Sequence, residues 1–254
     1  MRQEDDIRER RPATEGVYEN ARVLLMFPFH NEGPKLRLWA DRLLLPVADH
    51  VIGVNDGSTD DGPEYLRELG IHVLDQPQSG IGASIKRCVA YARENDFDVL
   101  VVMAGNGKDD PAEVPRLVEA LLAGADYVQG SRFLPGGSSP NLPLFRLVAI
   151  KVLSFLFTLW MRRRCTDLTN GFRAYRLAML DDPRIDIGQD WLDGYEYEYY
   201  VHWKAYELRY TVAEVPVTKR YPDERKVEYT KIRLVRDWWQ LLRPFVLLGL
   251  RIRK

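Results

Sequence analysis

The chain has 254 residues, of which 46% are hydrophobic and 29% are charged. This length suits one large domain, or one domain with an appendage, whose core is sizeable without disulfide or metal staples. The formal net charge of −1 provides no field that attracts nucleic acid, so we expect no nucleic-acid partner. The two cysteines, Cys88 and Cys165, suggest no disulfide framework and fit a reducing, cytoplasmic compartment.

Residues 1–21 have mixed charge and no apolar core, which predicts a mobile leader and no secretory signal. No apolar run reaches the roughly 18 residues of a membrane span. The longest run, 152–161, is closed by three arginines at 162–164. We therefore expect no transmembrane helix.

The first half of the chain alternates short apolar strands with helical patterns. Strands are expected at 22–27, 50–54, 71–74, 99–103 and 126–130, and helices at 35–45, 64–69, 80–93 and 113–123. This alternation predicts an α/β domain with a Rossmann-like, mostly parallel sheet and helices on both faces.

The second half is richer in apolar and aromatic helices. It predicts helices at 142–161 and 195–206, an edge strand at 212–217 and an apolar, basic helix at 232–250 that is broken near Pro244. Segment 166–176 mixes polar turn residues with an apolar element. The expected division is a leader at 1–21, the α/β domain at 22–231 and an amphipathic helical extension at 232–254.

A Gly-rich turn follows the apolar strand 99–103, in the order Ala104-Gly105-Asn106-Gly107-Lys108-Asp109-Asp110-Pro111. Ligands in open α/β sheets bind at the carboxyl ends of strands, so this turn is a candidate binding edge. Asp109 or Asp110 would cap a helix that has Pro111 in its first turn. An ordinary strand-to-helix loop is the alternative.

Asp56 stands at the end of the second expected strand, where a carboxylate can accept hydrogen bonds from the N–H groups of a nucleobase. Gly57 and Ser58 would let the backbone come close to such a ligand. The alternative is an Asx-turn, a frequent role of Asp-Gly. Segments 28–32 and 80–83 follow other strands of the same sheet, which favours a nucleoside site.

Four motifs, at 28–32, 55–60, 130–133 and 170–175, resemble those of family 2 inverting glycosyltransferases in both sequence and order. The closest branch contains dolichyl-phosphate mannose synthases and bacterial polyprenyl-phosphate sugar transferases. The resemblance covers about residues 22–232. It implies a GT-A fold that transfers a sugar, with inversion, from a UDP- or GDP-sugar.

The resemblance and the strand-end positions together give two sets of candidate site residues. The nucleotide set is Pro28, Phe29, Asn31, Glu32, Asp56, Gly57, Ser58, Gly80, Ala83 and Asn106, and the phosphate set is Lys108, Arg132, Arg146, Arg220 and Lys231.

The Gly-rich turn departs from the family pattern. The resemblance aligns it with an Asp-x-Asp-x-Gln motif that binds Mg²⁺ or Mn²⁺ and the donor diphosphate, but this chain has Ala104, Asn106 and Lys108 there. A neutral Asn is a poor ligand for a hard cation, whereas a lysine repels a metal and attracts a diphosphate. We therefore favour a site without metal, in which Lys108 supplies the charge. The alternative keeps Mg²⁺ or Mn²⁺ on Asn106 with Asp109 or Asp110.

Three carboxylates are candidates for a catalytic base, namely Asp167, Glu196 and Glu198. An acceptor hydroxyl would need such a base, whereas a lipid phosphate is already anionic and would not. Glu196 and Glu198 are two positions apart on an expected helix, so we expect only one of them to face the site.

Segments 147–157 and 233–254 combine apolar and basic residues, a composition typical of interfacial helices. With the resemblance, they favour a polyprenyl-phosphate acceptor and peripheral attachment to the inner face of a membrane. Packing against the core or against a second copy of the chain is the alternative. A soluble small-molecule acceptor, or a nucleotide-sugar binding protein without turnover, also remains open.

Overall fold

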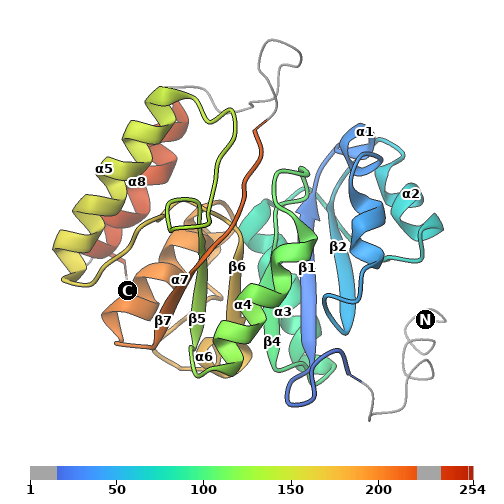
Figure 1. Ribbon diagram of the computed structural model, residues 1–254, viewed down its shortest axis with the longest axis horizontal. Helices are drawn as coiled ribbons and strands as arrows, with labels where there is room; N and C mark the ends of the chain where they lie inside the picture. Colours follow the sequence, from blue (N-terminus) through green and yellow to red (C-terminus); the bar gives the residue numbers. More distant parts are fainter. Residues whose placement is uncertain (1–15, 222–235, 251, 254) are drawn as a thin grey trace.

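The computed structural model describes residues 16–221, 236–250 and 252–253. Seven strands form one sheet in the order β3-β2-β1-β4-β6-β5-β7 (Figure 1). Their bounds are β1 Val23–Phe29, β2 His50–Asp56, β3 His72–Gln76, β4 Val99–Val102, β5 Tyr127–Ser131, β6 Arg173–Arg176 and β7 Val212–Pro216. Strand β6 is antiparallel to β4 and β5, and the other pairings are parallel. The expected mostly parallel sheet is confirmed, with β7 as an edge strand.

Helices cover both faces of the sheet, as expected. The α-helices are α1 Gly33–Leu36, α2 Gly62–Glu68, α3 Ile81–Glu94, α4 Val114–Leu122, α5 Leu144–Met161, α6 Leu177–Leu180, α7 Glu196–Glu207 and α8 Arg236–Gly249. Alternate side chains of β1 enter the cores on opposite faces of the sheet. Leu24 and Met26 belong to the core that includes residues of α3 and α7. Val23 and Leu25 belong to the core that includes residues of α1, α2 and α4. A strand buried on both faces explains the continuous apolar runs in the sequence.

The single helix expected at 35–45 is wrong. Helix α1 ends at Leu36, and a separate 3-10 helix covers Ala40–Leu44. Between them Trp39 leaves the helical conformation (φ −148°, ψ −17°), and its ring packs edge-on against Phe27 at 5.4 Å. Burial of this large ring against β1 takes precedence over the helical spacing.

Strand β6 lies in segment 166–176, whose mixture of polar turn residues and an apolar element does not predict a strand. The first residue of β6, Arg173, is fully buried, and its guanidinium donates hydrogen bonds to the backbone oxygens of Leu168, Asn170 and Glu198. An arginine whose donors are satisfied by carbonyls can occupy a core position. Because β6 is antiparallel, the loop before it lies at the carboxyl ends of β4 and β5.

Helix α5 lies beside α8 at the end of the molecule beyond β7 (Figure 1). It has 18 residues with a mean hydropathy of 1.8, and 17% of them are buried, so it is long and apolar enough to cross a membrane by length and composition alone. We expected no apolar segment of this length because Arg146 and Lys151 interrupt the apolar run in the sequence. Helix α5 shows that this expectation is wrong.

The expected break near Pro244 is also wrong, since α8 continues through it to Gly249. The buried Pro244 is followed by Phe245, whose ring contacts Tyr199 at 5.1 Å and Phe157 at 6.0 Å. These aromatic contacts hold the turn around the proline, which offsets the missing backbone hydrogen bond.

Candidate active site

A cavity of about 820 Å³ opens at the carboxyl ends of β1, β2 and β4 and extends to α5 and α7. This volume is in the range of small-molecule and cofactor sites. The structure brings together eleven of the candidate residues on its wall, namely Pro28, Phe29, Glu32, Asp56, Gly80, Asn106, Lys108, Arg132, Arg146, Glu196 and Glu198.

Other candidates lie behind the wall and shape the loops. Asn31 Oδ1 accepts a hydrogen bond from Thr59 N (2.8 Å), Ser58 Oγ accepts one from Asn31 N (3.0 Å), and Ala83 N donates to Asp193 O (3.1 Å). Gly57, Asp109, Asp110, Asp167 and Arg220 are likewise absent from the wall. Lys231 and most of the leader lie outside the described residues.

At the β2 end of the cavity, Asp56 organises the loop before α3. Its Oδ1 accepts hydrogen bonds from Gln76 Nε2 and Ser79 N, both at 2.8 Å, and its Oδ2 accepts one from Gly80 N at 3.0 Å. The carboxylate therefore fixes the loop and also reaches the wall of the cavity. This geometry combines the two roles that the sequence left open, loop closure and contact with a ligand.

We expect Asp56→Ala to weaken nucleotide binding by about 1.5–3 kcal/mol, the range for hydrogen bonds to a charged group. The loss is about 10- to 150-fold in Kd and is measured by calorimetry with UDP and GDP. The control is Asp75→Ala, which alters a carboxylate of β3 that pairs with Asn55 and Arg67 outside the cavity. Unchanged affinity in Asp56→Ala would show that Asp56 only closes its loop.

Four cationic side chains, Lys108, Arg132, Arg146 and Lys219, line the middle of the cavity. Burial lowers the pKa of the Lys108 ammonium to about 8, and the charges of Lys219 and Arg146 act in the same direction, while Asp109 opposes them. Arg132 and Lys219 are each paired with a carboxylate, and a cavity lined by four cationic side chains is suited to bind phosphate groups.

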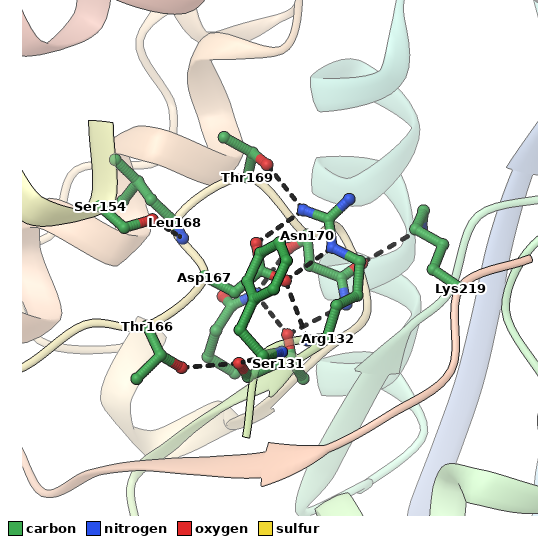
Figure 2. Close-up of polar contacts among 12 residues, drawn as sticks. Ser131, Arg132, Ser154, Thr166, Asp167, Leu168, Thr169, Asn170 and Lys219 are labelled. Carbon is green, nitrogen blue, oxygen red and sulfur yellow. Dashed lines mark hydrogen bonds and ion pairs between the residues drawn. The ribbon is translucent and has the colours of Figure 1, made fainter. Parts of the chain in front are cut away.

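Arg132 is held rigidly by Asp167 (Figure 2). Its Nε donates to Asp167 Oδ2 at 2.7 Å and its Nη2 donates to Asp167 Oδ1 at 2.6 Å, and both side chains are almost fully buried. Nη2 also donates to Thr169 Oγ1 at 2.8 Å. Asp167 thus faces Arg132 rather than the cavity, a geometry that favours a positioning role over that of a base.

The residues of the Gly-rich turn do not fit a divalent metal. Both carboxylate oxygens of Asp109 accept hydrogen bonds from Lys219 Nζ, at 2.7 and 2.8 Å. Asp110 caps the following 3-10 helix through Ala112 N, and Asn106 Oδ1 accepts from Lys108 N. Within residues 16–221, 236–250 and 252–253, no three His, Cys, Asp or Glu side chains are grouped to hold a metal ion.

Glu196 and Glu198 both line the cavity, so the expectation that only one of them would is wrong. The cavity lies at the start of α7, where Glu196 and Glu198 both reach its wall while Tyr197 between them is buried in the core. Glu196 Oε1 lies 3.5 Å from Arg243 Nη1 of α8. The Glu198 carboxylate packs against Gly171, where a Cβ atom would come within 2.8 Å of Oε1.

Three further residues line the cavity that the sequence patterns did not predict, namely Lys219, Tyr221 and Thr169. Lys219 and Tyr221 follow the carboxyl end of β7, just as the identified segments follow β1, β2 and β4. The same strand-end argument could have found them, because an edge strand was expected at 212–217.

Comparisons with known proteins agree with this fold and identify the family. The profile of Glycosyl transferase family 2 matches residues 25–182. Polyprenol monophosphomannose synthase from Mycolicibacterium smegmatis is 33% identical over 215 residues, which cover 82% of this chain and 80% of that protein. Undecaprenyl-phosphate mannosyltransferase from Micrococcus luteus is 33% identical over 209 residues, covering 78% of this chain and 83% of that protein.

Among solved structures, glucosyl-3-phosphoglycerate synthase from Mycobacterium tuberculosis, in complex with Mn²⁺, UDP and glucosyl-3-phosphoglycerate, superposes with a TM-score of 0.60. The two chains are 20% identical, and the match covers 85% of this chain and 80% of that one. This likeness shows the fold, and the sequence matches show the family. The chain therefore belongs to glycosyl transferase family 2 and is a glycosyltransferase with the GT-A fold.

Proposed function

We propose that this chain transfers a sugar from a UDP- or GDP-sugar to polyprenyl phosphate, with inversion and without a metal ion. The observation that carries the proposal is the order of groups along one cavity. Asp56 ends β2, Lys108 follows β4, and Arg132 follows β5, in the order of these strands across the sheet. Phe145, Ala149, Ile150 and Leu153 of α5 add an apolar part to the wall. The relatives' names, which specify polyprenyl acceptors, support the same assignment.

In the proposed step, a phosphate oxygen of the acceptor attacks the anomeric carbon of the sugar as its bond to the nucleoside diphosphate breaks. The electron pair of that bond leaves on the diphosphate, whose added negative charge Lys108, Arg132 and Arg146 would stabilise. An anionic acceptor needs no proton removed. Glu198 or Glu196 would serve as base for a hydroxyl acceptor.

The proposal is tested in two stages. A thermal-shift panel of UDP- and GDP-sugars identifies the donor, because a ligand that binds only the native state raises the melting temperature. Transfer is then measured to polyprenyl phosphate and to soluble acceptors. Donor binding with neither transfer nor hydrolysis would establish a binding protein, and transfer only to a soluble acceptor would refute the lipid assignment.

The lipid acceptor also implies a membrane-facing surface. Helix α5 exposes Val148, Val152, Phe155, Leu156, Leu159 and Trp160, and the end of α8 exposes Val246 and Leu250. Lys151 on the same helix and Arg162 directly after it are exposed, as are basic residues of interfacial helices that bind anionic lipids. We propose that the protein is cytoplasmic and attaches peripherally through this surface.

We expect the full chain to float with anionic liposomes at low salt. A chain cut after Lys231 keeps α5 but lacks α8, and we expect it to float less. Phe155→Ser, at a side chain that is 61% exposed, should weaken flotation without lowering the melting temperature. If the full chain ignores liposomes, the surface packs against another protein, and light scattering would show whether that is a second copy.

A further inference from the structure

The segment Lys219–Tyr221 begins shortly after β7, which ends at Pro216, and contacts the cationic centre through three successive residues. Lys219 places its ammonium between the Gly-rich turn and the loop before β6, Arg220 bonds to Lys108 through its backbone, and Tyr221 touches Lys108 and Arg132. None of these contacts belongs to the nucleoside end of the cavity.

Lys219 joins segments that are distant in the sequence. Besides the two bonds to Asp109, its Nζ donates to Asn170 Oδ1 at 3.1 Å, the contact drawn in Figure 2. Asp109 Oδ2 accepts a further hydrogen bond from Ala104 N at 3.2 Å, and Asn170 Nδ2 donates to Gly130 O at 3.0 Å. One buried ammonium therefore holds the turn that carries Lys108 against β5 and the loop before β6.

Tyr221 links two of the four cations of the centre, Lys108 and Arg132. Lys108 Nζ lies 5.0 Å from the centroid of its ring, within the range of cation–π attraction. On the other side, Arg132 Nη1 donates to the Tyr221 hydroxyl at 2.5 Å. Since Asp167 fixes the opposite edge of the guanidinium, Arg132 is held from both sides.

The backbone of the segment is itself pinned. Lys219 N donates to Ser138 O at 3.0 Å, Arg220 N to Lys108 O at 2.8 Å and Tyr221 N to Pro140 O at 3.0 Å. These hydrogen bonds, which lie on both sides of the segment, fix the backbone from which the side chains of Lys219 and Tyr221 extend.

From these contacts we propose that Lys219 and Tyr221 are positioning residues that hold Lys108 and Arg132 as a preformed two-cation clamp for the donor diphosphate. The inference rests on the proposed function, because it assigns the diphosphate to this centre. A preorganised clamp needs no reorganisation when the anion binds, and the charge is built into the chain rather than carried by a metal.

The test compares nucleoside with nucleoside diphosphate affinity, by calorimetry with uridine, UDP, guanosine and GDP. Tyr221→Phe keeps the ring and removes the acceptor for Arg132, so diphosphate affinity should fall about 2- to 10-fold. Tyr221→Leu also removes the ring under Lys108 and should lower it about 5- to 50-fold. Nucleoside affinity should not change in either variant.

Lys219 is tested with Lys219→Met/Asp109→Asn, because Lys219→Met alone would leave a buried carboxylate unpaired and could unfold the chain. The double variant should also lose diphosphate affinity and keep nucleoside affinity. Tyr65→Leu is the matched control for Tyr221→Leu. Tyr65 lies on α2 outside the cavity, and Arg37 Cζ is 4.4 Å from the centroid of its ring.

The proposal is overturned if the wild type prefers the diphosphate and these variants keep that preference, or if nucleoside and diphosphate affinities fall together. The proposed function fails separately if the binding changes occur as expected but no sugar is transferred. If the wild type binds the diphosphates no better than the nucleosides, both are refuted.

Discussion

Lys108→Met should lower the turnover of sugar transfer by about 10²–10³, the scale for losing one preorganised stabilising group. Methionine keeps an unbranched, apolar stem and removes the charge. The leaving diphosphate gains negative charge as the glycosidic bond breaks, and Lys108 stands in the cavity between Asn106 and the ring of Tyr221. Lys86→Met is the control, because Lys86 pairs with Asp193 and does not line the cavity.

The same argument predicts that EDTA leaves donor binding and turnover unchanged, since Asp109 is engaged by Lys219. Activity that EDTA abolishes and Mn²⁺ or Mg²⁺ restores would show that Lys108 has not replaced a metal. Asn106 with Asp109 or Asp110 would then be the ligands to test.

The pH profile adds a second measurement on the same residue. With a pKa of about 8, Lys108 is charged below that pH and loses its proton above it. The value of kcat/KM for the donor, which reports the free enzyme, should therefore fall as pH rises through about 8. In Lys108→Met this alkaline limb should disappear.

Asp167→Asn should destabilise the fold by about 3–5 kcal/mol, because it leaves the Arg132 guanidinium buried without a compensating charge. Urea unfolding measures the loss. The control is Asp181→Asn, which breaks the exposed pair between Asp181 and Arg93 and should cost about 0–1 kcal/mol.

The double variant Arg132→Met/Asp167→Asn should recover much of the lost stability, since no charge then remains unpaired, but it should bind the donor diphosphate weakly. If Asp167→Asn were as stable as the wild type and lost only transfer to hydroxyl acceptors, Asp167 would be the base.

Local patterns predicted the parts of the site that follow β1, β2 and β4. The apolar runs before Pro28, Asp56 and Ala104 identify these strand ends without knowledge of the tertiary structure. The partners of these residues are not local: Asp109 pairs with Lys219, and Asp167 pairs with Arg132. Such pairings depend on the tertiary structure, in which β6 lies between β4 and β5. Strand β6 is hard to recognise in the sequence because it begins with Arg173, and an arginine is seldom buried.

Local residue spacing predicted the wrong helix boundaries where a large aromatic ring packs into the core. Trp39 enters the core and divides the expected helix, and Phe245 packs against α7 so that α8 continues through Pro244. Both are cases in which the burial of one aromatic side chain outweighs backbone preference.

The position of β7 at the edge of the sheet has a consequence for biosynthesis. Strands β1 to β4 pair among themselves within residues 23–102, so the nucleoside end can assemble while later residues are still being translated. Lys219 and Tyr221 reach the centre only after β7 has joined β5. A nascent or proteolysed chain that ends before residue 219 contains Asp56 and its loop but lacks Lys219 and Tyr221. We therefore expect affinity for the diphosphate only after residues 219–221 have been synthesised.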